Sequence, residues 1–242
     1  IAALWAPEGE SREAYAARIL ASLPQALRAG GACHIRLNVR DATVAPADAL
    51  VQQWQVPQQA AIAQFWMPSA NARFRGAVDA ALAAHSAHFA AWLVCESTII
   101  ANAEPNVSPG KHSSNGAIPP RTRGWSQASF IAFRPDMTRE AVIAHWHSHH
   151  TRVAIETQAN FEYVQNLIVR PLTEDAPGYG AFVEECFTLD AMTDPGAFFD
   201  AVGNPEKLAA NLATMMDSCN GFIDFTRNDI IPSSQFDFTH LD

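Results

Sequence analysis

The spacing of apolar and polar positions divides the chain into two halves with a similar order of elements. In the first half, residues 33–39 alternate between polar and apolar types, as a half-buried strand does. Gly30 and Gly31 follow an amphipathic run and are typical of a helix end. The expected strands are residues 1–6, 33–39, 60–67 and 91–100, and the expected helices are residues 11–27 and 77–90.

The second half repeats this order. Asp194 is a typical N-cap, and Pro195 suits the first position of the helix that follows. We expect this helix to reach about Cys219, with a break at residues 203–205. Another helix is expected from Thr138 through the histidine-rich residues 145–150. The expected strands are residues 126–134, 160–170, 181–189 and 222–227.

Residues 102–124 are rich in Pro, Gly, Asn and Ser and show no apolar period, so they are expected to form a linker. The domains are then residues 1–101 and 125–242. Each has the order β-α-β-β-α-β, that of a ferredoxin-like unit in an α+β protein. We expect the two sheets to pack face to face around a central cavity. A single mixed α+β domain without repeat symmetry is the alternative.

Composition narrows the choice of partners. The chain has 242 residues, 48% of them hydrophobic, and a formal net charge of −9. The apolar content excludes a disordered chain, and the negative charge disfavours nucleic acid and membrane surfaces as partners. Four cysteines without short spacing are typical of free thiols in a reducing compartment, so a cytoplasmic location is expected. Only two lysines are present, which leaves little room for Schiff-base chemistry.

Four histidines lie within six positions, at residues 145, 147, 149 and 150. Their spacing is close to the H-x-H-x-D-H zinc motif of metallo-β-lactamase-like hydrolases. His149 stands where that motif needs Asp, however, and the segment has a helical pattern. We therefore expect no metal site here.

Helical geometry selects one member of the cluster. At about 100° per residue, His150 shares a face with Val142, Trp146 and Val153 and points inward. One interpretation is a core histidine whose nitrogens are satisfied locally. The other is a general acid or base in a largely apolar cavity, where burial keeps the imidazole neutral.

The strand after this helix has an unusually polar face. Asn160, Glu162, Asn166 and Arg170 share one parity, and apolar residues and Tyr163 occupy the other. This face either meets water or lines a polar cavity. Of Glu184 and Glu185 in the next expected strand, only one can face a given side. Asp224 alternates with apolar neighbours and is expected to face away from the helices.

The second half resembles the EthD-type branch of the dimeric α+β barrel superfamily. The resemblance rests on W-x-x-x-H, matched by Trp146 and His150, on the run HTRVAIETQANFEYVQNLIVRPLT, and on VEECF and FIDF. The first half, with LNVRDA and ESTII, fits a degenerate partner domain. The resemblance implies two ferredoxin-like units that form an intrachain dimeric α+β barrel. The G-x-x-D-G signature of haem-containing relatives is absent, and no cofactor is expected.

The resemblance implies a cofactor-independent enzyme of the lyase or isomerase kind, such as a dehydratase, decarboxylase or cyclase. Its partner would be a small hydrophobic molecule, aromatic or polyketide-like, and a homodimer is left open. The alternatives are a cofactor-free oxygenase of the quinone-forming type and a non-catalytic binding or accessory protein. The candidate catalytic residues are His150, Tyr163, Glu184 and Asp224. The candidate substrate-binding residues are Trp146, Glu156, Asn166, Arg170 and Glu185. Which carboxylate orients His150 stays open.

Overall fold

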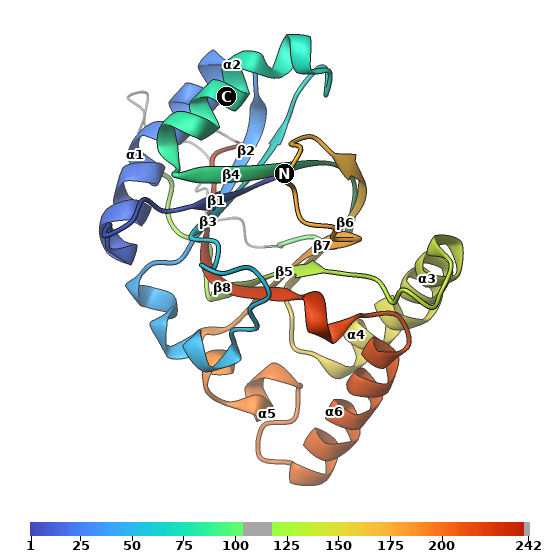
Figure 1. The fold of residues 1–242 in the computed structure, drawn as a ribbon. Coiled ribbons are helices and arrows are strands. Elements are labelled where there is room, and N and C mark those ends of the chain that lie inside the picture. The colour runs from blue at the N-terminus through green and yellow to red at the C-terminus, as the bar shows by residue number, and fades with distance from the viewer. Residues whose placement is uncertain (104–117, 240–242) are drawn as a thin grey trace.

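The computed structural model describes residues 1–103 and 118–239, and its strands form one closed barrel (Figure 1). Every neighbouring pair of strands in the barrel is antiparallel. Around the barrel the order is β1-β3-β2-β8-β5-β7-β6-β4. The strands are β1 (Ala2–Trp5), β2 (Cys33–Val39), β3 (Ala61–Trp66), β4 (His88–Ile100), β5 (Trp125–Ile131), β6 (Glu162–Pro171), β7 (Ala181–Phe187) and β8 (Asp229–Asp237).

The predicted fold class, two ferredoxin-like units whose sheets pack face to face in a dimeric α+β barrel, is wrong. The structure has a single closed antiparallel barrel of eight strands, in which β2 pairs with β8 and β4 pairs with β6. Unpaired strand edges expose N–H and C=O groups, and pairing across both edges satisfies them. The sequence pattern specifies individual strands but carries no signal for this edge-to-edge closure.

The helices lie outside the barrel (Figure 1). Helices α1 and α2 contact each other on one side, and α4 contacts α6 on another. Ser11 and Thr138 cap α1 and α3 by accepting hydrogen bonds from backbone N–H groups, as N-cap residues do. The α-helices are α1 (Arg12–Ala29), α2 (Ala72–His85), α3 (Arg139–His145), α4 (Thr151–Thr157), α5 (Pro195–Phe198) and α6 (Pro205–Asn220). The π-helical turn η2 (Trp146–His150) joins α3 to α4, and short 3₁₀ segments are η1 (Ala42–Leu50), η3 (Leu189–Met192) and η4 (Phe225–Arg227). Among the helices of the described ranges, none has the length and apolar character needed to cross a membrane.

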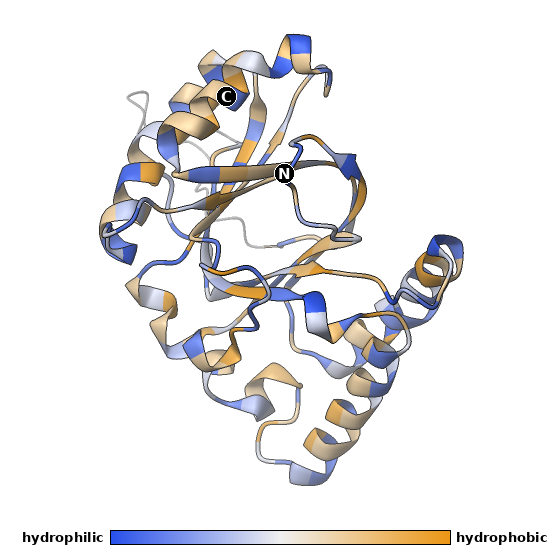
Figure 2. Cartoon of the chain, viewed as in Figure 1, coloured by the Kyte–Doolittle hydropathy of each residue, from blue (hydrophilic) through white to orange (hydrophobic). Residues whose placement is uncertain are grey.

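The alternation of side chains along each strand separates two kinds of core. In β2, Ile35 and Leu37 pack outward with residues of α1, and Arg36 lines the cavity on the other face of the strand. A second outer core lies under α3, η2 and α6 and contains Val142 and Trp146. Figure 2 shows many apolar residues in the central strands and a mixture of polar and apolar residues in the helices, as amphipathic helices require.

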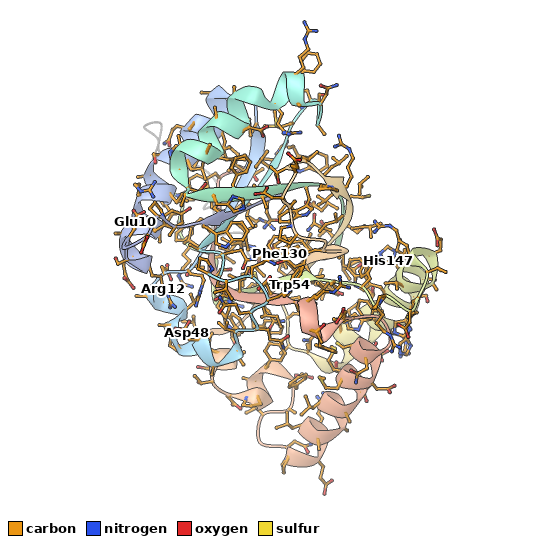
Figure 3. All side chains as sticks on the ribbon, in the orientation of Figure 1. Glu10, Arg12, Asp48, Trp54, Phe130 and His147 are labelled. Carbon is orange, nitrogen blue, oxygen red and sulfur yellow. The ribbon has the colours of Figure 1, made fainter. Side chains whose placement is uncertain are left out.

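One end of the barrel interior is filled by aromatic side chains. Phe130 lies 5.0 Å from Trp92, 5.0 Å from Tyr179 and 4.8 Å from Phe182, measured between ring centroids. Figure 3 shows Phe130 in the middle of the barrel, with Trp54 nearby. We call the rings of Trp92, Phe130, Tyr179 and Phe182 the aromatic cluster. The other end of the interior is polar, and it holds the candidate site.

Two predicted elements differ from the structure. The expected last strand, residues 222–227, is wrong: Asp224 caps the 3₁₀ turn η4, and the strand begins at Asp229. The side chain of Asp224 bonds the backbone N–H of Thr226, which favours a turn over a strand. The expected helix at residues 77–90 instead spans Ala72–His85, because Asn71 caps its first turn. Of the expected linker, residues 104–117 lie outside the described residues, and the division into two domains stays a prediction.

Candidate active site

A cavity of about 730 Å³ extends from the polar end of the barrel past α2. Its size is that of pockets that bind small organic molecules. Polar groups of its wall come from β2, β3, β6 and β8, namely Arg36, Gln64, Glu162, Asn166 and Gln235. Trp92, Val94 and Val164 provide apolar surface. The cavity therefore combines an apolar wall with a few converging polar groups.

Arg36 links two buried carboxyl groups, those of Glu162 on the cavity wall and of Glu184, which is not part of the lining. Its Nη1 donates hydrogen bonds to Oε1 of Glu162 at 2.8 Å and to Oε2 of Glu184 at 3.2 Å. The side chain of Arg36 is 25% exposed, whereas those of Glu162 and Glu184 are 2% and 0% exposed. Burial alone would lower the pKa of Arg36, and the surrounding carboxylates raise it instead. Arg36 therefore keeps its positive charge and presents part of its guanidinium to the cavity.

Glu184 is surrounded by hydrogen-bond donors. Its carboxylate accepts hydrogen bonds from Ser126 Oγ at 2.9 Å, Gln64 Nε2 at 2.8 Å and Gln235 Nε2 at 2.9 Å, and also from the side-chain amide of Asn38. Burial would raise its pKa, but Arg36 and these donors together lower it below the ordinary value. Glu184 is therefore ionised.

The pKa of Glu162 is shifted in the opposite direction, above its ordinary value. Burial raises its pKa, the charge of Glu184 raises it further, and Arg36 opposes both effects. Gln235 donates a hydrogen bond to its Oε1 at 3.2 Å, and the side chain of Asn102 is a further donor to this carboxyl group. Its Oε2 is buried and forms no hydrogen bond of ordinary geometry with the described residues. Neighbouring carboxyl groups whose pKa values are shifted in opposite directions are typical of acid–base sites.

Asn166 lies four residues beyond Glu162 on the same face of β6, and Val164 lies between them. The residue is 1% exposed, and its Nδ2 has no hydrogen-bond partner within the described part of the chain. An unpartnered buried donor on a cavity wall is a group that a ligand can satisfy. Asn166 is thus a sequence-predicted binding residue that the structure brings to the cavity. The polar face of this strand lines a cavity, and the interpretation in which it meets water is wrong at Glu162 and Asn166.

His150 lies in a different place, between η2 and α6 on the outside of the barrel. Its Nδ1 is 3.0 Å from Oγ of Ser218, and its ring centroid is 4.8 Å from that of Phe222. Burial lowers its pKa to about 4, with smaller contributions from His145 and His149. The inward orientation and the neutral imidazole are confirmed, but His150 is not among the residues that line the cavity. Its catalytic role stays a prediction.

Three further predicted residues share this outer layer. Trp146 is fully buried and packs against Phe222. Tyr163 accepts a hydrogen bond from Gln165 Nε2 at 2.7 Å, and its pKa is raised by burial. Glu185 accepts a hydrogen bond from Asn160 Nδ2 at 2.8 Å, and burial raises its pKa to about 7. Tyr163 and Glu185 lie on the opposite faces of β6 and β7 from Glu162 and Glu184.

The remaining predicted residues do not reach the cavity. Glu156 pairs with Arg152 at 2.7 Å on the exposed side of α4. Arg170 is exposed, and its Nη1 donates to the carbonyl oxygen of Pro171 at 3.3 Å. Asp224 forms an ion pair with Arg227 at 2.8 Å. The structure therefore brings Asn166 and Glu184 together at the site but leaves these three outside it.

Sequence reasoning missed Arg36, Asn38, Gln64, Glu162 and Gln235 as site residues, although it placed Glu162 on the polar face of its strand. Arg36 and Asn38 share the polar parity of residues 33–39, and Gln64 is the single polar residue in residues 60–66. These are the signals that could have revealed an interior polar face. Gln235 follows the expected end of the last strand, in a Ser-rich stretch after Pro232, and so had the pattern of a loop.

The histidine cluster is distributed around the helix. His145 Nε2 lies 3.1 Å from the carbonyl oxygen of Ser218, and Figure 3 shows His147 at the outer helices, away from the barrel. Within residues 1–103 and 118–239, no three side chains of His, Cys, Asp or Glu gather in an arrangement that could hold a metal ion.

In a comparison with known families, residues 134–226 match the EthD domain. The matched segment contains Glu162, Asn166 and Glu184 but not Arg36 or Gln235. Comparisons with curated proteins and with solved structures gave no match. Residues 134–226 therefore match the EthD domain, and this segment contributes the two carboxyl groups of the candidate site.

Proposed function

We propose that this protein is an enzyme of the lyase or isomerase kind that moves a proton on a small hydrophobic, aromatic molecule bound in the cavity. The observation that carries the proposal is the pair Glu162 and Glu184, two buried carboxyl groups that share Arg36 and whose pKa values are shifted in opposite directions. In such a pair, one carboxyl group takes up and releases the proton, and the other stays ionised.

In this proposal Glu162 is the general acid or base. Its raised pKa makes it a stronger base than an exposed carboxylate, and its Oε2 forms no hydrogen bond of ordinary geometry with the described residues. A substrate O–H or an acidic C–H placed against Oε2 would transfer its proton there. Arg36 would stabilise the negative charge that develops on a neighbouring substrate oxygen, because its guanidinium is partly exposed to the cavity.

Glu184 is a positioning residue in this scheme. It is fully buried and ionised, and its four hydrogen-bond donors include Gln64 and Gln235, which also line the cavity. Its charge holds Arg36 in place, and it keeps the pKa of Glu162 raised. Loss of Glu184 would therefore disturb the whole polar end of the barrel.

The apolar wall supports the choice of substrate. Trp92, Val94, Val164 and Phe65 line the cavity, and flat aromatic molecules bury much area against such side chains. The match to the EthD domain supports a role with small molecules but does not indicate which reaction is catalysed. Glu162 is preferred over His150 as acid or base, because His150 lies outside the cavity lining.

The test uses 6-hydroxy-2-acetonaphthone, a naphthalene with a methyl ketone at one end and a hydroxyl at the other. In D₂O, transfer of a methyl proton to Glu162 replaces hydrogen by deuterium, which NMR detects. We expect the wild type to accelerate this exchange and Glu162→Gln to lose at least ~10²-fold of that rate, the scale of general acid–base catalysis. The matched control is Glu140→Gln, at an exposed carboxylate of α3, with an unchanged rate.

Two results would overturn the proposal. One is exchange in the presence of wild-type protein that is no faster than in buffer; if the ketone nevertheless binds, the protein is a binding protein for such molecules. The other is an unchanged rate in the folded Glu162→Gln variant, which would remove Glu162 from the chemistry. Circular dichroism of each variant establishes that it is folded.

A further inference from the structure

We infer that the cavity selects an elongated, uncharged molecule that presents an acceptor oxygen to Nδ2 of Asn166, well away from the atom that meets Glu162. This inference rests on the proposed function for the role of Glu162, whereas the role of Asn166 follows from the position and contacts of Asn166 alone. Asn166 is 1% exposed, lines the cavity, and has no described partner for its Nδ2. An amide N–H at such a site is stabilised only by an acceptor that enters the cavity.

The spacing along β6 sets the length of the molecule. Glu162 and Asn166 are four residues apart on one strand face, which at a rise of ~3.3 Å per residue separates their Cα atoms by about 13 Å. Val164 lies between them on the cavity wall. A molecule that meets both polar groups must therefore be elongated, with a polar group toward each end and an apolar middle.

The surroundings of Asn166 favour an aromatic body. Across β7 its register partner is Phe182, a member of the aromatic cluster, and Trp92 of the same cluster also lines the cavity. Across β4 its partner is Glu96, another residue of the cavity wall. Asn166 thus lies where the polar end of the interior meets the aromatic end. An oxygen bound to it would belong to the distal end of a ring system.

The charges on the wall disfavour an anionic molecule. Both arginines that line the cavity are already bound by acidic groups. Arg36 contacts Glu162, Glu184 and Asp237, and Arg75 contacts Asp79 at 2.8 Å together with the carbonyl oxygens of Ala70 and Leu172. Glu96 and Asp237 add further acidic groups to the wall. The acidic groups of the wall outnumber its two arginines, so a full carboxylate or phosphate charge on the ligand would meet net repulsion.

A cationic ligand group does not suit Asn166 either, because Nδ2 is a donor and needs an acceptor. A hydroxyl, ether or carbonyl oxygen is an acceptor without charge. The combination of length, apolar middle, acidic wall and unpartnered donor therefore specifies an uncharged ring system with oxygen functions at opposite ends.

The test is a cycle of two ligands and two proteins, measured by isothermal titration calorimetry. The ligands are 6-hydroxy-2-acetonaphthone and 2-acetonaphthone, which lacks the hydroxyl, and the proteins are the wild type and Asn166→Leu. We expect the wild type to bind the hydroxylated ketone about tenfold more tightly, as a buried hydrogen bond allows, and Asn166→Leu to bind both equally. Because each protein is compared with itself across two ligands, a general loss of affinity in the variant does not affect the result.

The charge preference is measured with 6-hydroxy-2-naphthoate, the carboxylate analogue. We expect it to bind the wild type at least about tenfold more weakly than the ketone, and Asp237→Asn, which removes an acidic group beside Arg36, to reduce that difference. The inference is overturned if neither ketone binds, if Asn166→Leu keeps the preference for the hydroxyl, or if the naphthoate binds as tightly as the ketone. If only the proposed function fails, the protein does not accelerate deuterium exchange but the affinities are still as expected, because binding does not depend on proton exchange.

Discussion

Nη1 of Arg36 lies 2.8 Å from Oε1 of Glu162, although 126 residues separate the two in the sequence. Arg36 belongs to β2 and Glu162 to β6, two strands that are not neighbours in the barrel, so the ion pair crosses its interior. Glu162 lies within the EthD match and Arg36 lies outside it. The candidate site is therefore built jointly by the EthD domain and by the N-terminal part of the chain.

Removal of this cation should destabilise the fold strongly. In Arg36→Met, the buried carboxyl groups of Glu162 and Glu184 lose their counter-ion, and we expect the free energy of unfolding to fall by about 3–5 kcal/mol. Urea denaturation measures this loss. The double variant Arg36→Met with Glu184→Gln should recover part of it, because one uncompensated charge is removed. Arg152→Met breaks an exposed pair with Glu156 and should cost less than about 0.5 kcal/mol. A stable Arg36→Met variant would contradict this account.

Glu185 predicts an unusual dependence of stability on pH. Its pKa is about 7 in the folded protein, against an ordinary value of 4.5, because the carboxyl is buried; the hydrogen bond from Asn160 opposes this rise. Between these two values the folded chain binds more protons than the unfolded chain, so this contribution to stability falls as pH rises from 4.5 to 7. We expect Glu185→Gln to unfold like the wild type at pH 4.5 and to be more stable at pH 8, by about 3 kcal/mol.

Urea denaturation at several pH values checks the role of Glu185. The exposed Glu156→Gln serves as the control and should leave the pH profile unchanged. A Glu185→Gln variant that is no more stable than the wild type at pH 8 would show that the ionised carboxylate is not penalised.

His150 contributes with the opposite sign. Its pKa falls to about 4 on folding from an ordinary value of 6.5, so the unfolded chain binds the extra proton between these values. This contribution to stability is complete above pH 6.5 and is lost as pH falls toward 4. His150→Gln should remove that acid-sensitive part, and it should also lower stability at pH 7 through the lost contacts with Ser218 and Phe222.

The same variant tests the catalytic assignment made from the sequence. We expect His150→Gln to keep the ketone exchange rate per folded molecule, because the imidazole does not line the cavity. A loss of at least ~10²-fold at unchanged melting temperature would instead support His150 as the acid or base.

Several local features could be predicted from the sequence because a single helix or strand determines them. The shared face of Val142, Trp146 and Val153 is buried, and the alternating residues 33–39 form β2 with Ile35 and Leu37 in an outer core. The break near Gly203 separates α5 from α6. These results follow from the periods of helix and strand alone.

The site could not be located in this way, because a side chain in a barrel covered by helices can be buried in two places. It can lie between a helix and the outer wall of the barrel, or inside the barrel. The inward face of the helix at His150 meets α6 and the outer wall, while the cavity lies on the other side of the strands. Asn38, Gln64 and Gln235 had the pattern of solvent-facing residues, yet they hydrogen-bond Glu184 inside the barrel. Polar side chains can be buried when distant strands supply their partners, and sequence spacing does not reveal those partners.

The aromatic end of the barrel offers a last prediction, which separates stability from ligand binding. The hydroxyl of Tyr179 donates a hydrogen bond to the buried carboxylate of Asp229. Asp229 also accepts from the backbone N–H groups of Trp54 at 2.7 Å and Gln55 at 3.0 Å. Tyr179→Phe removes this hydrogen bond and the one that the hydroxyl accepts from Nε2 of Gln59 at 3.3 Å, and it leaves those backbone donors in place. We expect a loss of about 1–2 kcal/mol in the free energy of unfolding.

Affinity for 6-hydroxy-2-acetonaphthone should be unchanged in Tyr179→Phe, because the ring that packs against Trp92 at 5.6 Å remains. Tyr179→Leu removes the ring as well, so the indole of Trp92, which lines the cavity, loses its support. That variant should lose about 3 kcal/mol or more of stability and should also bind the ketone more weakly. Equal affinities in the two variants would show that packing in the aromatic cluster does not shape the cavity. A Tyr179→Phe variant that binds the ketone more weakly than the wild type would place the hydroxyl, rather than the ring, in contact with the site.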